Sequence, residues 1–122
     1  MGNVEYILVP YTHKNPRVRQ WRVDTAAMFC AARRNNGYHP YCAIVECHPV
    51  ESFMDGDRGD FSNWEAYNRL MMQRSNSAII LPLPGWSTSV GIHGETHYWT
   101  DELRRSEPLV FTLWAEYIAT NL

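Results

Sequence analysis

Hydrophobic and polar positions along the chain follow two periods, one typical of buried strands and the other of amphipathic helices. Short runs rich in β-branched, aliphatic and aromatic residues predict strands. We expect these strands at residues 4–9, 38–45, 78–83 and 109–113. Apolar residues at helical spacing predict helices. We expect these helices at residues 16–35, 61–75 and 89–104, with residues 46–60 as a loop and residues 114–122 as a short helix or tail.

This alternation of strands and helices predicts a single α/β domain that spans residues 1–122. Short apolar strands between helices favour a parallel sheet covered on both faces. Because crossover connections are right-handed, we expect a doubly wound, mainly parallel sheet of four to five strands, Rossmann-like or flavodoxin-like. Ligands of such folds bind where the carboxyl ends of the strands meet. Residues 10–13, 46–49 and 85–95 should converge there.

The segment from Leu81 to Glu95 offers an anion site, because a strand, a turn with Gly and Ser, and a helix N-terminus follow one another. Free backbone N–H groups and the helix dipole favour an anion at such a place. Glu95 would lie about one turn into this helix, near whatever the turn holds. The alternative is structural: similar turns often hold nothing, and an early Glu can simply complement the helix dipole.

Ser89, Gly91 and Glu95 form the pattern Ser-x-Gly-x-x-x-Glu. It resembles the Ser-x-Gly-x-Gly-x-Glu signature of the 2'-deoxynucleoside 5'-phosphate N-hydrolases, with His93 in place of the second Gly. These enzymes belong to the nucleoside 2-deoxyribosyltransferase superfamily. The resemblance implies that Ser89 helps to bind a 5'-phosphate and that Glu95 attacks the anomeric carbon of the sugar. An ordered series of shorter matches extends the similarity over most of the chain.

Other candidate contacts come from these matches and from the ends of the predicted strands. The candidate substrate-binding residues are Pro10, Tyr11, Thr12, His13, Arg19, His48, Ser89 and Gly91. Tyr11 follows a strand and could stack on a base. Arg19 lies near a helix N-terminus, where a cation is unfavourable without a nearby anion, so it is a candidate for the phosphate. Its neighbours Arg17 and Arg22 are expected to be exposed to solvent.

Asn68 and Asn76 stand where the family that the chain resembles usually has aspartates. The resemblance gives Asn68 a catalytic position, in contact with the sugar or near the transferred proton. An Asn keeps the shape and the hydrogen bonding of an Asp but cannot act as an acid or base. Weak activity, a replacement acid or lost catalysis would each be consistent with this change. Glu65, Asp57 and Asp60 could replace the acid, or they could be solvated surface residues.

We therefore expect hydrolysis of the N-glycosidic bond of a (2'-deoxy)nucleoside 5'-monophosphate, which releases the free base and a sugar phosphate. One alternative is a nucleotide-binding module that has lost catalysis. Another is a nucleoside deoxyribosyltransferase that exchanges bases, although the transferases of this family act on unphosphorylated nucleosides. The resemblance also implies a homodimer or larger oligomer. Residues 111–117 could form part of its interface or could cap the chain's own core.

Composition and charge narrow the classes of protein and of ligand that remain possible. The chain is 45% hydrophobic, which fits a folded domain, and its net charge of −2 argues against binding to polymeric nucleic acid. It has no apolar run of membrane-spanning length, and its three cysteines lack a CxxC spacing, so we expect a cytoplasmic protein with reduced thiols. His93 and His97 could share a helix face and bind zinc, but no third ligand is evident. We expect no metal and no cofactor.

Overall fold

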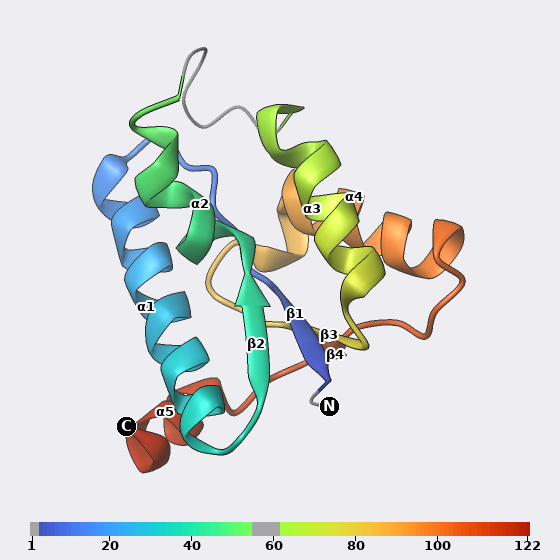
Figure 1. The fold of residues 1–122 in the computed structure, drawn as a ribbon. Helices are drawn as coiled ribbons and strands as arrows, with labels where there is room; N and C mark the ends of the chain where they lie inside the picture. The colour runs from blue at the N-terminus through green and yellow to red at the C-terminus, as the bar shows by residue number, and fades with distance from the viewer. Residues whose placement is uncertain (1–2, 55–61) are drawn as a thin grey trace.

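A parallel four-stranded sheet forms the centre of the molecule in the computed structural model, which describes residues 3–54 and 62–122 (Figure 1). The strand order is β2-β1-β3-β4. The strands are β1 (Val4–Leu8), β2 (His39–Cys42), β3 (Ser77–Ile80) and β4 (Leu109–Val110). The helices are α1 (Pro16–Asn35), α2 (Ala43–Glu51), α3 (Ser62–Arg74), α4 (Val90–His97) and α5 (Trp114–Asn121). The expected doubly wound α/β fold is confirmed, with four strands among the described residues.

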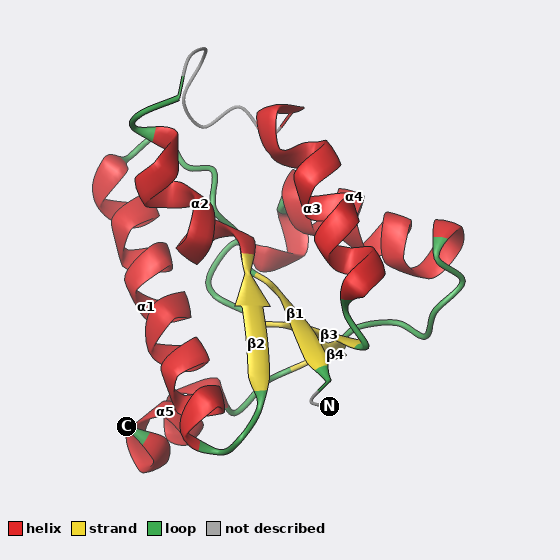
Figure 2. Ribbon diagram, viewed as in Figure 1, coloured by secondary structure: helices red, strands yellow, loops and turns green. Residues whose placement is uncertain are grey.

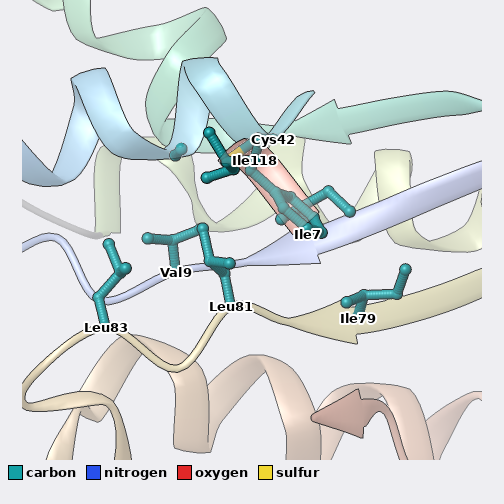
Figure 3. Close-up of a cluster of buried hydrophobic side chains, with 9 residues drawn as sticks. Ile7, Val9, Cys42, Ile79, Leu81, Leu83 and Ile118 are labelled. Atoms are coloured by element: carbon teal, nitrogen blue, oxygen red, sulfur yellow. The ribbon is translucent and has the colours of Figure 1, made fainter. Parts of the chain in front are cut away.

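Helices cover both faces of the sheet, α1 and α5 on one side and α3 and α4 on the other (Figure 2). Successive strand residues point to opposite faces, so Ile7 and Val9 join one hydrophobic cluster while Tyr6 and Leu8 join a second. The first cluster lies beneath α1 and α5 and consists of Ile7, Val9, Ala26, Phe29, Cys42, Ile79, Leu81, Leu83 and Ile118. In Figure 3, Val9, Leu81 and Ile79 rise from the same side of the sheet.

Helix α1 has the predicted boundaries because local signals define both of its ends. The Asn15 side chain caps its start by accepting a hydrogen bond from the Arg17 N–H at 2.9 Å, and Pro16 occupies the first helical position. Gly37 follows the helix with a φ of 84°, a left-handed conformation that glycine adopts without strain.

Helix α2 corrects the sequence-based expectation at residues 43–51, where a strand was expected to run to residue 45 and a loop to follow it. Residues 55–60 of that expected loop lie outside the described residues. The pairing of β2 with β1 stops at Ile7 and Cys42, one residue before β1 itself ends. After Cys42 the chain turns into a helix and buries Ala43, Cys47 and Glu51 at intervals of four residues.

The last two strands are shorter than predicted. Strand β3 stops at Ile80, just before Pro82, and β4 pairs with it only through Leu109 and Val110. The predicted helix at residues 89–104 is α4, continued by a π-helical segment, η2 (Tyr98–Glu102). The helix predicted at residues 61–75 corresponds to α3.

The C-terminal segment packs against the chain's own core. Phe111, Trp114 and Tyr117 contact the cluster beneath α1 and α5, and the Phe111 ring centroid lies 5.1 Å from that of Phe29. Within residues 3–54 and 62–122, no helix has the length and apolar character needed to cross a membrane. All three cysteines carry free thiols.

Candidate functional site

A pocket of about 920 Å³ lies at the carboxyl ends of the strands. Its wall combines the segment after β1, one face each of α1, α2 and α3, and the chain from Pro84 to Glu95. The volume is that of a site for a small organic ligand. The location agrees with the rule that open α/β sheets bind ligands where the strand order reverses, here between β1 and β3.

The pocket brings together most of the residues that the sequence singled out. Those in its wall are Pro10, Tyr11, Thr12, His13, His48, Asn68, Ser89, Gly91 and Glu95. Arg19 does not line the pocket, and its guanidinium instead donates a hydrogen bond to the carbonyl of His13. The three predicted segments therefore converge at one place, although they come from distant parts of the chain.

The N-terminus of α4 opens into the pocket through Ser89, Val90 and Gly91. The Ser89 Oγ accepts a hydrogen bond from the Ile92 N–H at 3.3 Å, which caps the helix and leaves the hydroxyl proton available to a ligand. The first N–H groups of a helix have no acceptor within it. Those of Val90 and Gly91 can therefore bind an anion at this end of the pocket.

Arg22 lines the same part of the pocket, and its predicted exposure is wrong. Only 7% of the residue is exposed, because α1 places it on the buried side, one turn before Ala26. Its guanidinium donates to the carbonyls of Thr12 at 3.1 Å and Pro84 at 2.9 Å. Its buried Nε has no hydrogen-bond partner among the described residues. Burial lowers the pKa of Arg22, but a guanidinium stays charged at any physiological pH.

Gly85 allows the pocket wall to approach Arg22 closely. Its φ of 92° lies in the left-handed region, where a side chain is strained. A Cβ at this position would also stand 2.9 Å from the Arg22 Nη2. The turn after β3 therefore requires glycine both for its backbone and for the space that the guanidinium occupies.

Glu95 contributes a buried carboxyl group to the pocket, with 8% of the residue exposed. It lies one turn after Gly91, on the same face of α4. The Tyr6 hydroxyl donates a hydrogen bond to its Oε2, and within the described structure no cation pairs with it. Burial raises the pKa of Glu95 to about 7, although the hydrogen bond from Tyr6 acts in the opposite direction. Burial also raises the pKa of Tyr6, so this phenol remains a donor.

Asn68 and Asn76 lie at opposite ends of the sheet. Asn68 lines the pocket, and its buried Oδ1 has no partner in the described part of the chain. Together with Glu95 it also borders a crevice of about 40 Å³ behind the pocket. The Asn76 Oδ1 instead accepts a hydrogen bond from the Val4 N–H at 2.8 Å, at the start of β1, so Asn76 is outside the site.

The acids considered as replacements lie elsewhere. Glu65 forms an exposed ion pair with Arg69 at 2.6 Å and borders the crevice but not the pocket. Asp57 and Asp60 fall outside the described residues. The pocket itself therefore offers no acid at the position of Asn68.

Tyr11 and His48 form a hydrogen-bonded pair in the pocket wall. The Tyr11 hydroxyl lies 2.7 Å from the His48 Nδ1, and the His48 Nε2 lies 3.3 Å from the Gln20 Oε1. Because the Gln20 oxygen can only accept, a neutral ring carries its proton on Nε2 and accepts the Tyr11 proton on Nδ1. Burial, and next to it the charge of Glu51, raise the pKa of Tyr11, so its hydroxyl is neutral at physiological pH.

Glu51 is a pocket residue that the sequence analysis missed, because it did not predict α2. Five residues of this helix line the pocket: Ala43, Ile44, Cys47, His48 and Glu51. Their spacing is that of one helix face, and this pattern would have identified the helix and its pocket side.

The two histidines considered for zinc have other contacts. The His93 Nε2 lies 2.6 Å from the Ser87 carbonyl oxygen, and His97 pairs with Asp101 at 2.7 Å. Across residues 3–54 and 62–122, no group of three or more His, Cys, Asp and Glu side chains is placed to hold a metal ion.

These features define a doubly wound α/β domain with a ligand-sized pocket at the carboxyl edge of its sheet. Residues 3–115 match a protein family described as "Domain of unknown function (DUF1937)". Since this match covers most of the chain, the protein belongs to that family. Comparison with curated proteins gives no match.

Proposed function

We propose that the protein hydrolyses the N-glycosidic bond of a (2'-deoxy)nucleoside 5'-monophosphate and releases the free base and a sugar phosphate. The resemblance of Ser89, Gly91 and Glu95 to the N-hydrolase signature suggests this reaction. One observation carries the proposal: the buried carboxyl group of Glu95 faces the same pocket as the N-terminus of its own helix. An anion site and a nucleophile are thus held at a fixed separation by about one helical turn.

The phosphate would bind at the N-terminus of α4. The Ser89 hydroxyl and the N–H of Gly91 can donate to its oxygens, and the helix dipole favours its negative charge. Arg22 adds a cation to the same part of the wall, whereas Arg19 does not line the pocket. We therefore assign the phosphate contact to Arg22 rather than to Arg19.

Glu95 would act as the nucleophile in its ionised form. Its Oε1 attacks C1' of the sugar while the C1'–N bond breaks and its electron pair leaves with the base. The carboxylate also stabilises the positive charge that develops on the sugar in the transition state. Because Tyr6 donates to Oε2, it orients the group and leaves Oε1 for attack. Water then attacks C1' of the glycosyl-enzyme, restores the carboxylate and gives up a proton.

The departing base must leave as an anion or take up a proton. Asn68 cannot supply that proton, but its side-chain amide lines the pocket and can form a hydrogen bond with a sugar hydroxyl. The neutral Tyr11 hydroxyl is the alternative donor, and His48, on the other side of its hydrogen bond, can return the proton if it is itself protonated.

The test is incubation with ribose and deoxyribose 5'-monophosphates of each common base, with free base measured by chromatography. We expect release from at least one nucleotide. Glu95→Gln should reduce it at least about 1000-fold, because an amide is a far poorer nucleophile. Glu116→Gln, an exposed carboxyl on α5, is the matched control and should keep full activity. Absence of release from every nucleotide would rule out the proposed hydrolysis.

The replacement of an acid by Asn68 favours one other function, a nucleotide-binding module that has lost catalysis. Calorimetry with the same nucleotides distinguishes the two, since the module would bind them without releasing base. A base-exchanging transferase would reveal itself by incorporating a second, labelled base into product.

The expected homodimer and the expected cytoplasmic location remain predictions. Packing of Phe111, Trp114 and Tyr117 on the chain's own core gives these rings a role that needs no partner. Light scattering at micromolar concentration tests the oligomeric state.

A further inference from the structure

The wall that α2 contributes to the pocket contains a second buried carboxyl group, that of Glu51. Only 8% of this residue is exposed, and it lines the pocket together with His48 and Cys47. Among residues 3–54 and 62–122, its carboxylate takes part in no hydrogen bond or ion pair. A structural carboxylate at this burial would normally have such a partner.

An unpartnered carboxylate restricts what can occupy the space beside it. It has two oxygens that only accept hydrogen bonds, and covering them with a ligand that brings no donors is unfavourable. A ligand that presents two neighbouring N–H or O–H donors would satisfy both oxygens at once. Anionic groups would be repelled, so the phosphate belongs elsewhere in the pocket.

The positions of the other pocket residues indicate which part of a nucleotide reaches Glu51. Helices α2 and α4 lie on opposite sides of the strand ends (Figure 1), and the phosphate site is at the start of α4. Glu95 and Asn68 meet at the crevice behind the pocket, so the sugar lies against them. The base then extends towards α2. Tyr11, whose pKa is raised partly by the charge of Glu51, and the half-buried ring of Trp64 border the space for it.

We propose that Glu51 binds the nucleobase and selects guanine, a base with a ring N–H next to an exocyclic amino group. This inference rests on the proposed function for the placement of the sugar and phosphate. Guanine offers two adjacent donors to the two carboxylate oxygens. Adenine and cytosine place a lone pair next to their amino group, and uracil and thymine flank their single N–H with carbonyl oxygens. Each of these would set an acceptor against an acceptor.

Binding of guanosine, inosine and adenosine 5'-monophosphates, measured by calorimetry on the wild-type protein, tests this selection without relying on any variant. Inosine monophosphate lacks only the amino group. We expect it to bind roughly 10- to 100-fold more weakly than guanosine monophosphate, as for the loss of one hydrogen bond to a charged group. Equal binding of the three nucleotides would overturn the proposal, and so would a preference for adenosine monophosphate.

Glu51→Gln tests whether this residue is responsible for the selection. The preference for guanosine over inosine monophosphate should fall to within about threefold, because the amide has one acceptor and one donor group. Glu46→Gln, an exposed carboxyl on the same helix, should leave the preference unchanged. A preference that survives Glu51→Gln would overturn the assignment. A change confined to the ratio of ribose to deoxyribose nucleotides would also overturn it, because the carboxylate would then bind the sugar.

Failure of this inference and failure of the proposed hydrolysis give different results. Selective guanosine monophosphate binding without base release would support the role of Glu51 and refute the reaction. Base release with equal efficiency from all nucleotides would support the reaction and refute the role of Glu51. If no nucleotide binds, both proposals are wrong.

Discussion

Glu5 and Glu95 are both buried carboxyl side chains, and they lie near opposite ends of the sheet. Glu5, at the start of β1, receives hydrogen bonds on both oxygens from Arg33, whose guanidinium also lies 3.7 Å from the centroid of the Tyr38 ring. Glu95 has the neutral Tyr6 hydroxyl as its partner and faces the pocket. A buried glutamate is therefore paired with a cation at the amino end of the sheet, and it has a neutral donor and an open pocket at the carboxyl end.

The same contrast extends to the neighbouring polar groups. At the amino end, even the exposed Asn76 binds the backbone of β1. At the carboxyl end, the Asn68 Oδ1 and the Arg22 Nε are buried without partners in the described structure. Unpaired buried polar groups are unfavourable and rare in folded proteins. Two of the four such groups in the described structure line this pocket. This indicates that the carboxyl end is shaped for a ligand, while the amino end stabilises the fold.

The largest expected effect is at the amino end. Glu5→Gln should destabilise the protein by about 3–5 kcal/mol, because it leaves the buried Arg33 guanidinium without its counter-charge. Urea unfolding followed by circular dichroism measures this change. The matched control is Glu65→Gln, which breaks an exposed ion pair and should change stability by less than about 1 kcal/mol. Similar effects of the two substitutions would remove the contrast drawn for Glu5.

The same substitution at the other end should have the opposite sign. The pKa of Glu95 is about 7 in the folded protein against an ordinary value of 4.5. Below pH 4.5 the carboxyl is protonated in both states. Between pH 4.5 and 7 only the unfolded state loses the proton, so stability falls as pH rises and the loss is complete above pH 7. Glu95→Gln should therefore be more stable than wild type by about 3 kcal/mol at pH 8.

Urea unfolding of both proteins at pH 5 and pH 8 measures this difference. The gap between Glu95→Gln and wild type should widen from pH 5 to pH 8, and Glu116→Gln should follow the wild-type curve at both values. A gap independent of pH would mean that ionisation of Glu95 does not oppose folding.

The sequence predicts some elements of the fold better than others, for physical reasons. The strands and α1 were predictable because hydrophobic period and capping residues act locally, and the boundaries of α1 agree with the structure. Helix α2 was missed despite its helical spacing, because its apolar start resembles a strand and Pro49 resembles a turn. Strand β2 ends where its pairing with β1 stops, at Cys42 and Ile7, and this pairing depends on a distant segment.

The residues of the candidate site were likewise predictable only where the signal is local in the sequence. Ser89, Gly91 and Glu95 lie within one local motif and could be found together. Arg22 could have been found from its place between Val18 and Ala26 on the buried face of α1. The contact of Tyr6 with Glu95 joins residues from β1 and α4 across a buried face of the sheet, and no spacing in the sequence encodes it.

Two glycines near the pocket should respond in opposite directions to the same change. Gly85→Ala should destabilise the protein by about 2 kcal/mol, because a left-handed backbone disfavours a side chain and the new Cβ displaces Arg22. Gly94→Ala should stabilise it by about 0.5–1 kcal/mol, since α4 has open space there. Thermal melting compares the two variants. Equal effects would show that Arg22 does not depend on the Gly85 turn.

A further expected effect concerns Tyr6, the hydrogen-bond partner of Glu95 in the described structure. Tyr6→Phe removes a hydrogen bond that favours the carboxylate, so the pKa of Glu95 should rise further above its ordinary value. A hydrogen bond to a charged group contributes about 1.5 kcal/mol, which corresponds to about one pH unit. The pH range over which stability falls should therefore extend upward by about one unit, and any base release should need a correspondingly higher pH. Carbon-13 NMR titration of the glutamate carboxyls measures the shift directly.

Tyr41→Phe is the matched control, because its ring lies 5.8 Å from that of Tyr6 while its hydroxyl is not a hydrogen-bond partner of Glu95 in the described structure. If both variants moved the Glu95 titration equally, packing of the aromatic rings and not the hydroxyl of Tyr6 would set the pKa of the proposed nucleophile.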